Sequence, residues 1–355
     1  MIFSKSHLWA ILFACTFMLA SCDKGDEKPS ELYQTGVFIT NEGPFGSGTG
    51  TVSYYDRDAD IIKNDIYGTA NNGAAIGNVL QSMNLYSGKA YLIVNNANKM
   101  IVTTSKTFIN ESTLATGLTL PRYFLPIDAT RAYITQWGKD SATSGILVYD
   151  YASKTIAKTV PTGKGADRML RNANTGSVWV LNSGGLGKDS TVSIINSTIG
   201  VDTVLQKIKV GLGPNSIVQD ANGDMWILCY GEYLKSSGKL VKIRNGAVEY
   251  SFDVPYGASG LIADKSKTTL YYLANNQIYT KDLLNFGATA PSVFLKPTGA
   301  TALYSLGFDP KTNLLWCGDA LDFKQSGAVY IIDPTTKTEK KKLTVGVAPN
   351  GFIFQ

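Results

Sequence analysis

Short apolar runs that carry an aromatic residue recur along the chain, and each leads into a loop rich in asparagine or glycine. Seven such runs are spaced by about 45 residues: Val37–Ile39, Ala90–Leu92, Ala132–Ile134, Val178–Val180, Met225–Ile227, Leu270–Tyr272 and Leu314–Trp316. A second run, rich in β-branched and aromatic residues, follows most of these loops, as in Gly145–Asp150 and Gly327–Asp333. The pattern predicts two neighbouring β-strands in each copy.

Two further strands complete each copy. A more polar run follows, such as Thr155–Val160, and a turn such as Gly213–Asn215 leads into a fourth strand. Four strands in about 45 residues are typical of one blade of a β-propeller, and a blade buries both faces only against its neighbours. The sequence therefore predicts an all-β, seven-bladed propeller with four-stranded blades over residues 36–355. Two packed β-sandwiches are the alternative, and they explain the near-equal spacing poorly.

The two ends of the repeat region complement each other. Residues Gly351–Phe354 form an inner strand with no blade after it, and the Val37–Ile39 run is a second strand with none before it. We expect the C-terminal strand to join the first blade, because this would close the ring and hide its open edges.

The N-terminus has the features of an export signal. Lys5 precedes an apolar run, Leu8–Leu19, that is too short to span a bilayer, and Leu19-Ala20-Ser21-Cys22 looks like the lipobox of bacterial lipoproteins. We therefore expect a signal peptide over residues 1–21, a lipid on Cys22, and a flexible tether over residues 22–35. An ordinary signal peptide with a cysteine nearby is the alternative.

These features predict a location as well. The lipid anchor would hold the protein at the outer membrane, and the acidic start of the tether resembles the surface-export signal of Bacteroidetes lipoproteins. Display at the cell surface is the favoured orientation, and a periplasm-facing anchor is the alternative.

Composition narrows the possible chemistry. Apolar residues make up 44% of the chain, which excludes general disorder, and the net charge of +5 forms no basic stripe, so nucleic acid is not an expected partner. The single histidine, His7, leaves with the signal peptide. The mature chain would then have no imidazole for a catalytic triad or a metal site. We expect a binding protein rather than an enzyme, with no cofactor and no metal.

Two cysteines belong to the propeller region. Cys229 and Cys317 fall in non-adjacent repeats, so we expect free buried thiols rather than a disulfide.

Loops place the candidate site. In a propeller, the loops between the second and third strands share one face with the loops that lead into the inner strands. Five of the former are long here, while Asn95–Lys99 and Asn275–Gln277 are tight, and uneven loops on an even scaffold favour a functional face. The expected ligand-binding residues are Asn41, Glu42, Phe45, Asn78, Arg122, Tyr123, Trp137, Arg168, Asn215, Tyr230, Tyr233, Tyr256, Tyr304 and Asn350.

These residues combine aromatic faces, amides and two arginines. Such a set suits a large, flat ligand with polar edges, although the same residue types are common at turns and strand ends. Carboxylates in the same loops leave room for an acidic-site hydrolase or lyase, which would need two of them to converge. The loop candidates for that role are Glu42, Glu232, Asp319 and Asp322.

Several stretches resemble a known family. Val37–Gly43, the glycine-rich stretch that ends at Gly50, Thr51–Asp56 and Gln81–Met83 look like the start of Bacteroidetes YncE-like surface lipoproteins. The resemblance covers the whole mature chain and implies a seven-bladed propeller. Its BtuG-type members capture cobalamin at the cell surface and pass it to a TonB-dependent transporter, whereas these scaffold motifs carry over no binding residue.

The expected function follows from these features together. The chain is predicted to bind a ligand on its loop-bearing face and to assist uptake by a TonB-dependent outer-membrane transporter, with a cobalamin-type corrinoid as the first candidate ligand. A surface scaffold that binds a protein or a glycan is the second interpretation, and the acidic-site hydrolase or lyase is the third.

Overall fold

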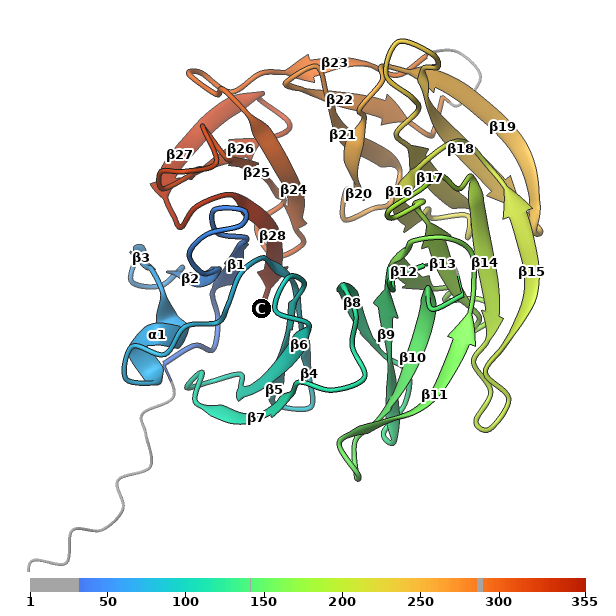
Figure 1. Ribbon diagram of the computed structural model, residues 1–355. Helices are drawn as coiled ribbons and strands as arrows, with labels where there is room; N and C mark the ends of the chain where they lie inside the picture. Colours follow the sequence, from blue (N-terminus) through green and yellow to red (C-terminus); the bar gives the residue numbers. More distant parts are fainter. Residues whose placement is uncertain (1–31, 141, 286–289) are drawn as a thin grey trace, which may run out of the picture. The chain divides into compact units, whose positions relative to one another are not determined.

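The computed structural model describes residues 32–140, 142–285 and 290–355. Within them, 28 strands form seven four-stranded antiparallel sheets that are arranged as the blades of a β-propeller (Figure 1). The predicted all-β, seven-bladed architecture is confirmed. The predicted signal peptide, the lipid attachment at Cys22 and the tether up to residue 31 lie outside the described residues. No helix within the described ranges is long and apolar enough to cross a membrane.

Each blade runs from an inner strand beside the ring axis to an outer edge strand (Figure 1). The first blade contains β28 (Pro349–Phe354), β1 (Val37–Asn41), β2 (Thr51–Asp56) and β3 (Ile61–Lys63). The second contains β4 (Leu80–Tyr86), β5 (Lys89–Val94), β6 (Lys99–Thr104) and β7 (Asn110–Leu114). The third contains β8 (Pro121–Pro126), β9 (Arg131–Gln136), β10 (Gly145–Asp150) and β11 (Thr155–Pro161).

The remaining blades repeat this order along the chain. The fourth contains β12 (Ala166–Arg171), β13 (Val178–Asn182), β14 (Thr191–Asn196) and β15 (Thr203–Lys209). The fifth contains β16 (Pro214–Gln219), β17 (Met225–Cys229), β18 (Gly238–Arg244) and β19 (Ala247–Val254). The sixth contains β20 (Ser259–Ala263), β21 (Thr269–Ala274), β22 (Gln277–Asp282) and β23 (Ser292–Leu295). The seventh contains β24 (Leu303–Asp309), β25 (Leu314–Asp319), β26 (Ala328–Asp333) and β27 (Thr338–Thr344).

The C-terminal strand closes the ring. Strand β28 pairs antiparallel with β1, with Val37 opposite Phe354 and Ile39 opposite Phe352 (Figure 1). The closure is covered by an aromatic cluster, because the rings of Phe352 and Phe354 lie 5.9 and 5.8 Å from the ring of Trp316 in the seventh blade. The predicted closure is therefore confirmed, and it joins the two ends of the propeller through both backbone and side chains.

The hydrophobic core lies between the blades. Trp179 of the fourth blade, for example, shares one buried cluster with Ile227 of the fifth. Between the first and second blades, Tyr33 packs against Phe38 and Phe108. Tyr33 falls in the segment expected to be a tether, and its burial shows that at least this residue belongs with the propeller. The short helix α1 (Ile66–Ala70) covers the same cluster with buried apolar side chains.

The tight loops and the cysteines agree with expectation. Asn275 and Asn276 form the β21–β22 turn with φ of 48° and 55°, a left-handed pair that is typical of a two-residue type I′ hairpin. Cys229 and Cys317 are buried and unpaired with each other. Burial raises the pKa of the Cys229 thiol to about 12, so it stays protonated and unreactive at neutral pH.

The aromatic closure allows a direct test. A Cβ on Gly307 of β24 would lie 2.8 Å from Cδ2 of Phe352 and 3.0 Å from Cε2 of Phe354. We expect Gly307→Ala to destabilise the protein by about 1–3 kcal/mol, because the rings of the closing strand must shift in a packed seam. Urea unfolding measures the loss. Gly187→Ala is the matched control, since its Cβ would meet nothing nearer than 3.7 Å. Equal stability of the two variants would contradict the packing described.

Candidate ligand-binding face

One end of the ring carries the predicted residues. We call it the loop face, and define it as the loops that follow β1, β5, β9, β13, β17, β21 and β25, together with the loops that lead into the inner strands and the first three residues of those strands. Exposed aromatic side chains gather there. Among the described residues, six of the seven exposed aromatics belong to this face, namely Phe45, Tyr230, Tyr233, Tyr256, Tyr304 and Phe323. The seventh, Tyr250, lies on the outer strand β19.

These aromatics form two contact groups. The ring of Tyr256 lies 5.2 Å from that of Tyr230 and 5.5 Å from that of Tyr233, so three tyrosines from two loops form one group. The rings of Tyr304 and Phe323 lie 5.1 Å apart in an edge-to-face arrangement. Such contacts hold the rings in fixed orientations while one side of each stays open to solvent. The loop face therefore offers preformed apolar surfaces.

A carboxyl–phenol pair joins the first and seventh blades on this face. The Tyr304 hydroxyl donates to Oε2 of Glu42 at 2.6 Å. Burial raises the pKa of Glu42, although this hydrogen bond and the nearby positive charge of Arg122 oppose the rise. Burial and the neighbouring carboxylate also raise the pKa of Tyr304. Glu42 can thus change protonation state closer to neutral pH than an exposed glutamate does.

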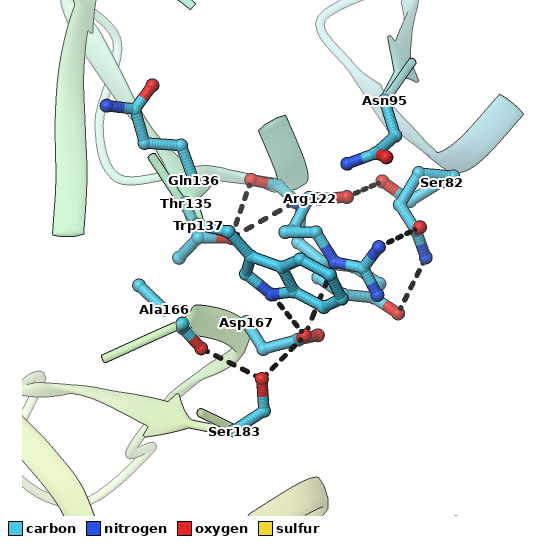
Figure 2. A network of polar contacts seen from close by, with 12 residues as sticks. Ser82, Asn95, Arg122, Thr135, Gln136, Trp137, Ala166, Asp167 and Ser183 are labelled. Atoms are coloured by element: carbon cyan, nitrogen blue, oxygen red, sulfur yellow. Dashed lines mark hydrogen bonds and ion pairs between the residues drawn. The ribbon is translucent and has the colours of Figure 1, made fainter. Parts of the chain in front are cut away.

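A stacked cation occupies the side of the face near the third and fourth blades (Figure 2). The guanidinium of Arg122 lies 4.1 Å from the centre of a Trp137 ring. Oδ2 of Asp167 accepts from Nε of Arg122 at 3.3 Å, from Nε1 of Trp137 at 3.0 Å and from Oγ of Ser183 at 3.1 Å. Gln81 accepts a further hydrogen bond from the same guanidinium. The charge of Arg122 is therefore balanced within the protein.

Arg168 differs from Arg122 in its partners. Its guanidinium lies over the ring of Tyr123 at 4.7 Å, and it has no carboxylate or hydrogen-bond partner in the described part of the chain. Arg168 and Tyr123 line a cavity of about 240 Å³ among the inner strands, together with Gln81 and Asn350. Arg168 therefore presents an uncompensated positive charge at the axis, where an anionic or carbonyl oxygen of a ligand could bind it.

Three of the four predicted amides serve the scaffold instead. Asn41 is fully buried, and its Nδ2 donates to Ser53 at 2.9 Å. Asn350 links β28 to β4 by donating to the carbonyl of Leu80 at 2.8 Å. Asn215 likewise donates to a carbonyl of the next blade, that of Ala258, at 2.9 Å.

Asn78 holds the β1–β2 loop in place. Its Nδ2 donates to the carbonyls of Pro44 at 3.0 Å and Ser47 at 3.2 Å. The amide thereby positions Phe45, which is 80% exposed at the tip of that loop. Asn78 thus acts on the candidate site through the loop that it orders.

Three residues at the centre were not among the predicted site residues. Gln81 falls in the Gln81–Met83 stretch, which carries only the family resemblance, and Ser183 lies three residues after the Val178–Val180 run. Asp167 precedes Arg168 in β12, so its position beside an arginine was the only sequence signal. Gln81 and Asp167 contact Arg122, and Ser183 contacts Asp167. These contacts join the second, third and fourth blades, whose equivalent positions lie about 45 residues apart in sequence.

The four loop carboxylates considered for hydrolysis have separate partners. Glu42 pairs with Tyr304, and Glu232 pairs with Lys188 at 2.6 Å and Lys235 at 2.8 Å. Asp319 is buried and accepts from backbone amides, including that of Ala302 at 2.8 Å. Asp322 is another turn residue, whose carboxylate accepts from two backbone amides. No two of the four carboxylates share a hydrogen-bond partner among the described contacts. Across the described part of the chain, no group of three or more histidine, cysteine, aspartate or glutamate side chains is placed to hold a metal ion.

Comparison with known proteins agrees with this architecture. Residues 35–354 match the family described as Domain of unknown function (DUF5074). No curated protein matches the chain significantly. Among solved structures, a quinonprotein alcohol dehydrogenase-like protein from Bacteroides thetaiotaomicron is 15% identical, with 90% of this chain and 78% of that chain covered and a TM-score of 0.67.

Two further structures show the range of names attached to this fold. The periplasmic gluconolactonase of Pseudomonas aeruginosa is 14% identical, with 90% of this chain and 98% of that chain covered and a TM-score of 0.66. Dihydro-heme d1 dehydrogenase is 11% identical, with 92% of this chain and 77% of that chain covered and a TM-score of 0.57. At such identities the likeness shows the propeller fold alone. The expectation that the chain is not an enzyme therefore stays a prediction.

Removal of Asp167 tests the central network. We expect Asp167→Ala to lower the free energy of unfolding by about 3–5 kcal/mol, because it leaves the largely buried guanidinium of Arg122 without its counter-charge. Tryptophan emission should shift to the red as the Trp137 indole loses its acceptor. Glu111→Ala is the control, since it removes an exposed ion pair with Lys89 and should cost about 1 kcal/mol or less. A loss no larger than that of the control would contradict the network.

The raised pKa of Glu42 predicts a pH-dependent difference in stability. A carboxyl with a raised pKa in the folded state contributes stability below its unfolded pKa of about 4.3 and loses it as pH rises through the folded value. Glu42→Gln keeps an acceptor for Tyr304 without the charge. The stability of this variant relative to the native chain should therefore increase from acidic to mildly alkaline pH. Urea unfolding over that range measures it, and a pH-independent difference would be the contrary result.

Proposed function

Since the chain belongs to the DUF5074 family, we propose that it is a non-enzymatic outer-membrane lipoprotein that captures a large, flat ligand on its loop face. The first ligand to test is a cobalamin-type corrinoid, and the proposed role is delivery to a TonB-dependent transporter. The observation that carries the proposal is the gathering, on that one face, of six of the seven exposed aromatics among the described residues. Exposed apolar patches of this kind mark binding sites, because isolated monomers rarely tolerate them.

The size of the axial cavity favours binding on the face rather than within the ring. Its volume of about 240 Å³ is below the roughly 300–1,000 Å³ of pockets that enclose drug-sized molecules. A corrin ring is too large to enter it. A large ligand would instead cover the mouth of the cavity, with its flat surfaces against the two aromatic groups and a polar edge within reach of Arg168.

The charges of the face support the same ligand class. Arg122 is balanced by Asp167, and Glu42 is held by Tyr304. Arg168 is the cation that lines the axial cavity, and it has no ion-pair partner in the described part of the chain. A ligand with extended ring surfaces and few anionic or carbonyl groups matches this arrangement. The neighbour named dihydro-heme d1 dehydrogenase adds support, because its name refers to a haem, which is a tetrapyrrole, and its chain has a similar fold.

Location at the outer membrane follows from the lipobox at Cys22 and is part of the proposal. Replacing Cys22 with alanine in the full-length chain should release the protein from the membrane fraction. The YncE-like, BtuG-type assignment is proposed on the residues around Val37–Gly43 and Gln81–Met83.

Titration with cyanocobalamin tests the function. We expect binding at micromolar concentration or tighter, and at least tenfold weaker binding by Tyr256→Ala, because that ring contacts both Tyr230 and Tyr233 and its loss opens the group. Isothermal titration calorimetry measures both. Tyr250→Ala is the matched control, since it removes an exposed aromatic that lies outside the loop face and should leave affinity unchanged.

Absence of heat and of co-purifying cobalamin at these concentrations would remove the corrinoid proposal. A pull-down from outer membranes then separates the other interpretations, since recovery of a host or matrix polymer would favour a scaffold role. Hydrolysis of gluconolactone, abolished by Glu42→Gln, would favour a lactonase, the activity that one structural neighbour is named for.

A further inference from the structure

A groove of about 680 Å³ opens on the face opposite the loop face, between the fourth and fifth blades. Its walls come from the loops β12–β13, β14–β15 and β16–β17 and from the hairpin between β18 and β19. It shares no lining residue with the candidate site above. Its volume falls within the roughly 300–1,000 Å³ of small-molecule sites.

The floor of the groove is apolar but holds one polar atom without a partner. Trp179, Ile194, Met225 and Ile243 form the floor and belong to the core shared by the two blades. Trp179 is 4% exposed, and its indole nitrogen has no hydrogen-bond acceptor among the described residues. By contrast, the indole of Trp226 donates to Asp220 at 2.8 Å. An unsatisfied buried donor is costly, so a ligand oxygen that accepts from Trp179 would bind favourably.

Neutral amides form the walls. Asn174, Asn222 and Asn245 line the groove from three different loops, and none of their side-chain amides has a hydrogen-bond partner in the described part of the chain. Asn196 also lines the groove, and it accepts only from the backbone amide of Thr198. Each amide offers a donor and an acceptor side by side. Four groups of this kind around an apolar floor match a ligand with many hydroxyl groups.

The charged residues of the walls are bound to the protein. Asp224 lies 2.7 Å from Arg244 and 3.0 Å from Lys242, and Glu249 pairs with both of these cations. The guanidinium of Arg171 donates to the carbonyl of Ile127 at 2.8 Å. An ionic ligand would therefore find little free counter-charge in the walls, whereas a neutral ligand does not need any.

We propose that this groove is a second binding site, which takes a neutral saccharide. Vicinal hydroxyls of a sugar can each donate to and accept from the wall amides, and the C–H face of the ring can cover Met225 and Ile243. One ring oxygen or hydroxyl would accept from the indole of Trp179. The site is independent of the loop face, so its failure would leave the proposed capture function untouched.

The test uses the purified full chain without its lipid and three neutral probes: maltotriose, cellotriose and N,N′-diacetylchitobiose. We expect at least one to bind, with quenching or shift of tryptophan emission. The double variant Asn174→Ala/Asn222→Ala should bind at least tenfold more weakly, a change of about 1.4 kcal/mol. Asn72→Ala is the control, because it removes an exposed asparagine that lies outside the groove.

Trp179→Phe keeps the apolar floor and removes only the N–H donor. It should weaken binding severalfold without abolishing the fold, so it carries the test if the double variant is unstable. Failure of all three probes at about 10 mM, a range beyond ordinary weak binding, would overturn the proposal. So would sugar binding that survives the groove variants and is lost in Tyr256→Ala, or binding of a neutral peptide in place of any sugar.

Discussion

The pairing of β28 with β1 is the constraint on which the other features depend. A blade has two apolar faces, and each is buried only by a neighbouring blade, so an open ring would expose two of them at once. The closing strand brings the aromatic rings of Phe352 and Phe354 to Trp316 and seals that seam. The loop face depends on the same closure, because Glu42 of the first blade reaches Tyr304 of the seventh only when the ring is complete.

Much of the fold was predictable because it repeats. Seven aromatic-centred runs at near-equal spacing leave few architectures, and an unpaired strand at each end leaves one way to close the ring. The tight Asn275–Asn276 turn was visible for a similar reason, since two asparagines between apolar runs suit two left-handed residues. The burial of Tyr33 between the first and second blades was not predictable, because a single tyrosine among polar residues forms no repeating hydrophobic pattern.

The candidate site was predicted at the level of the face but less well residue by residue. Aromatic residues in the long loops were a good guide to exposed rings on this face, because a ring in a loop has little core to enter. Their role in binding stays a prediction. Amides were a poor guide. Asn41, Asn215 and Asn350 have the residue type expected of ligand contacts, yet their side chains satisfy backbone and hydroxyl groups between strands and blades. A sequence cannot separate these uses, since both need a donor and an acceptor at a strand end.

The two arginines show why the centre of the face required a structure. Arg122 and Arg168 look equivalent in sequence, each at the start of an inner strand. The repeat places Asp167 and Trp137 around Arg122, where its charge is neutralised, while Arg168 faces Tyr123 and the axial cavity alone. A buried, paired cation adds little net binding energy for a ligand, whereas an unpaired one gains a partner when the ligand arrives. In the proposed capture function, Arg168 would therefore orient the ligand, and the aromatic surfaces around it would supply the affinity.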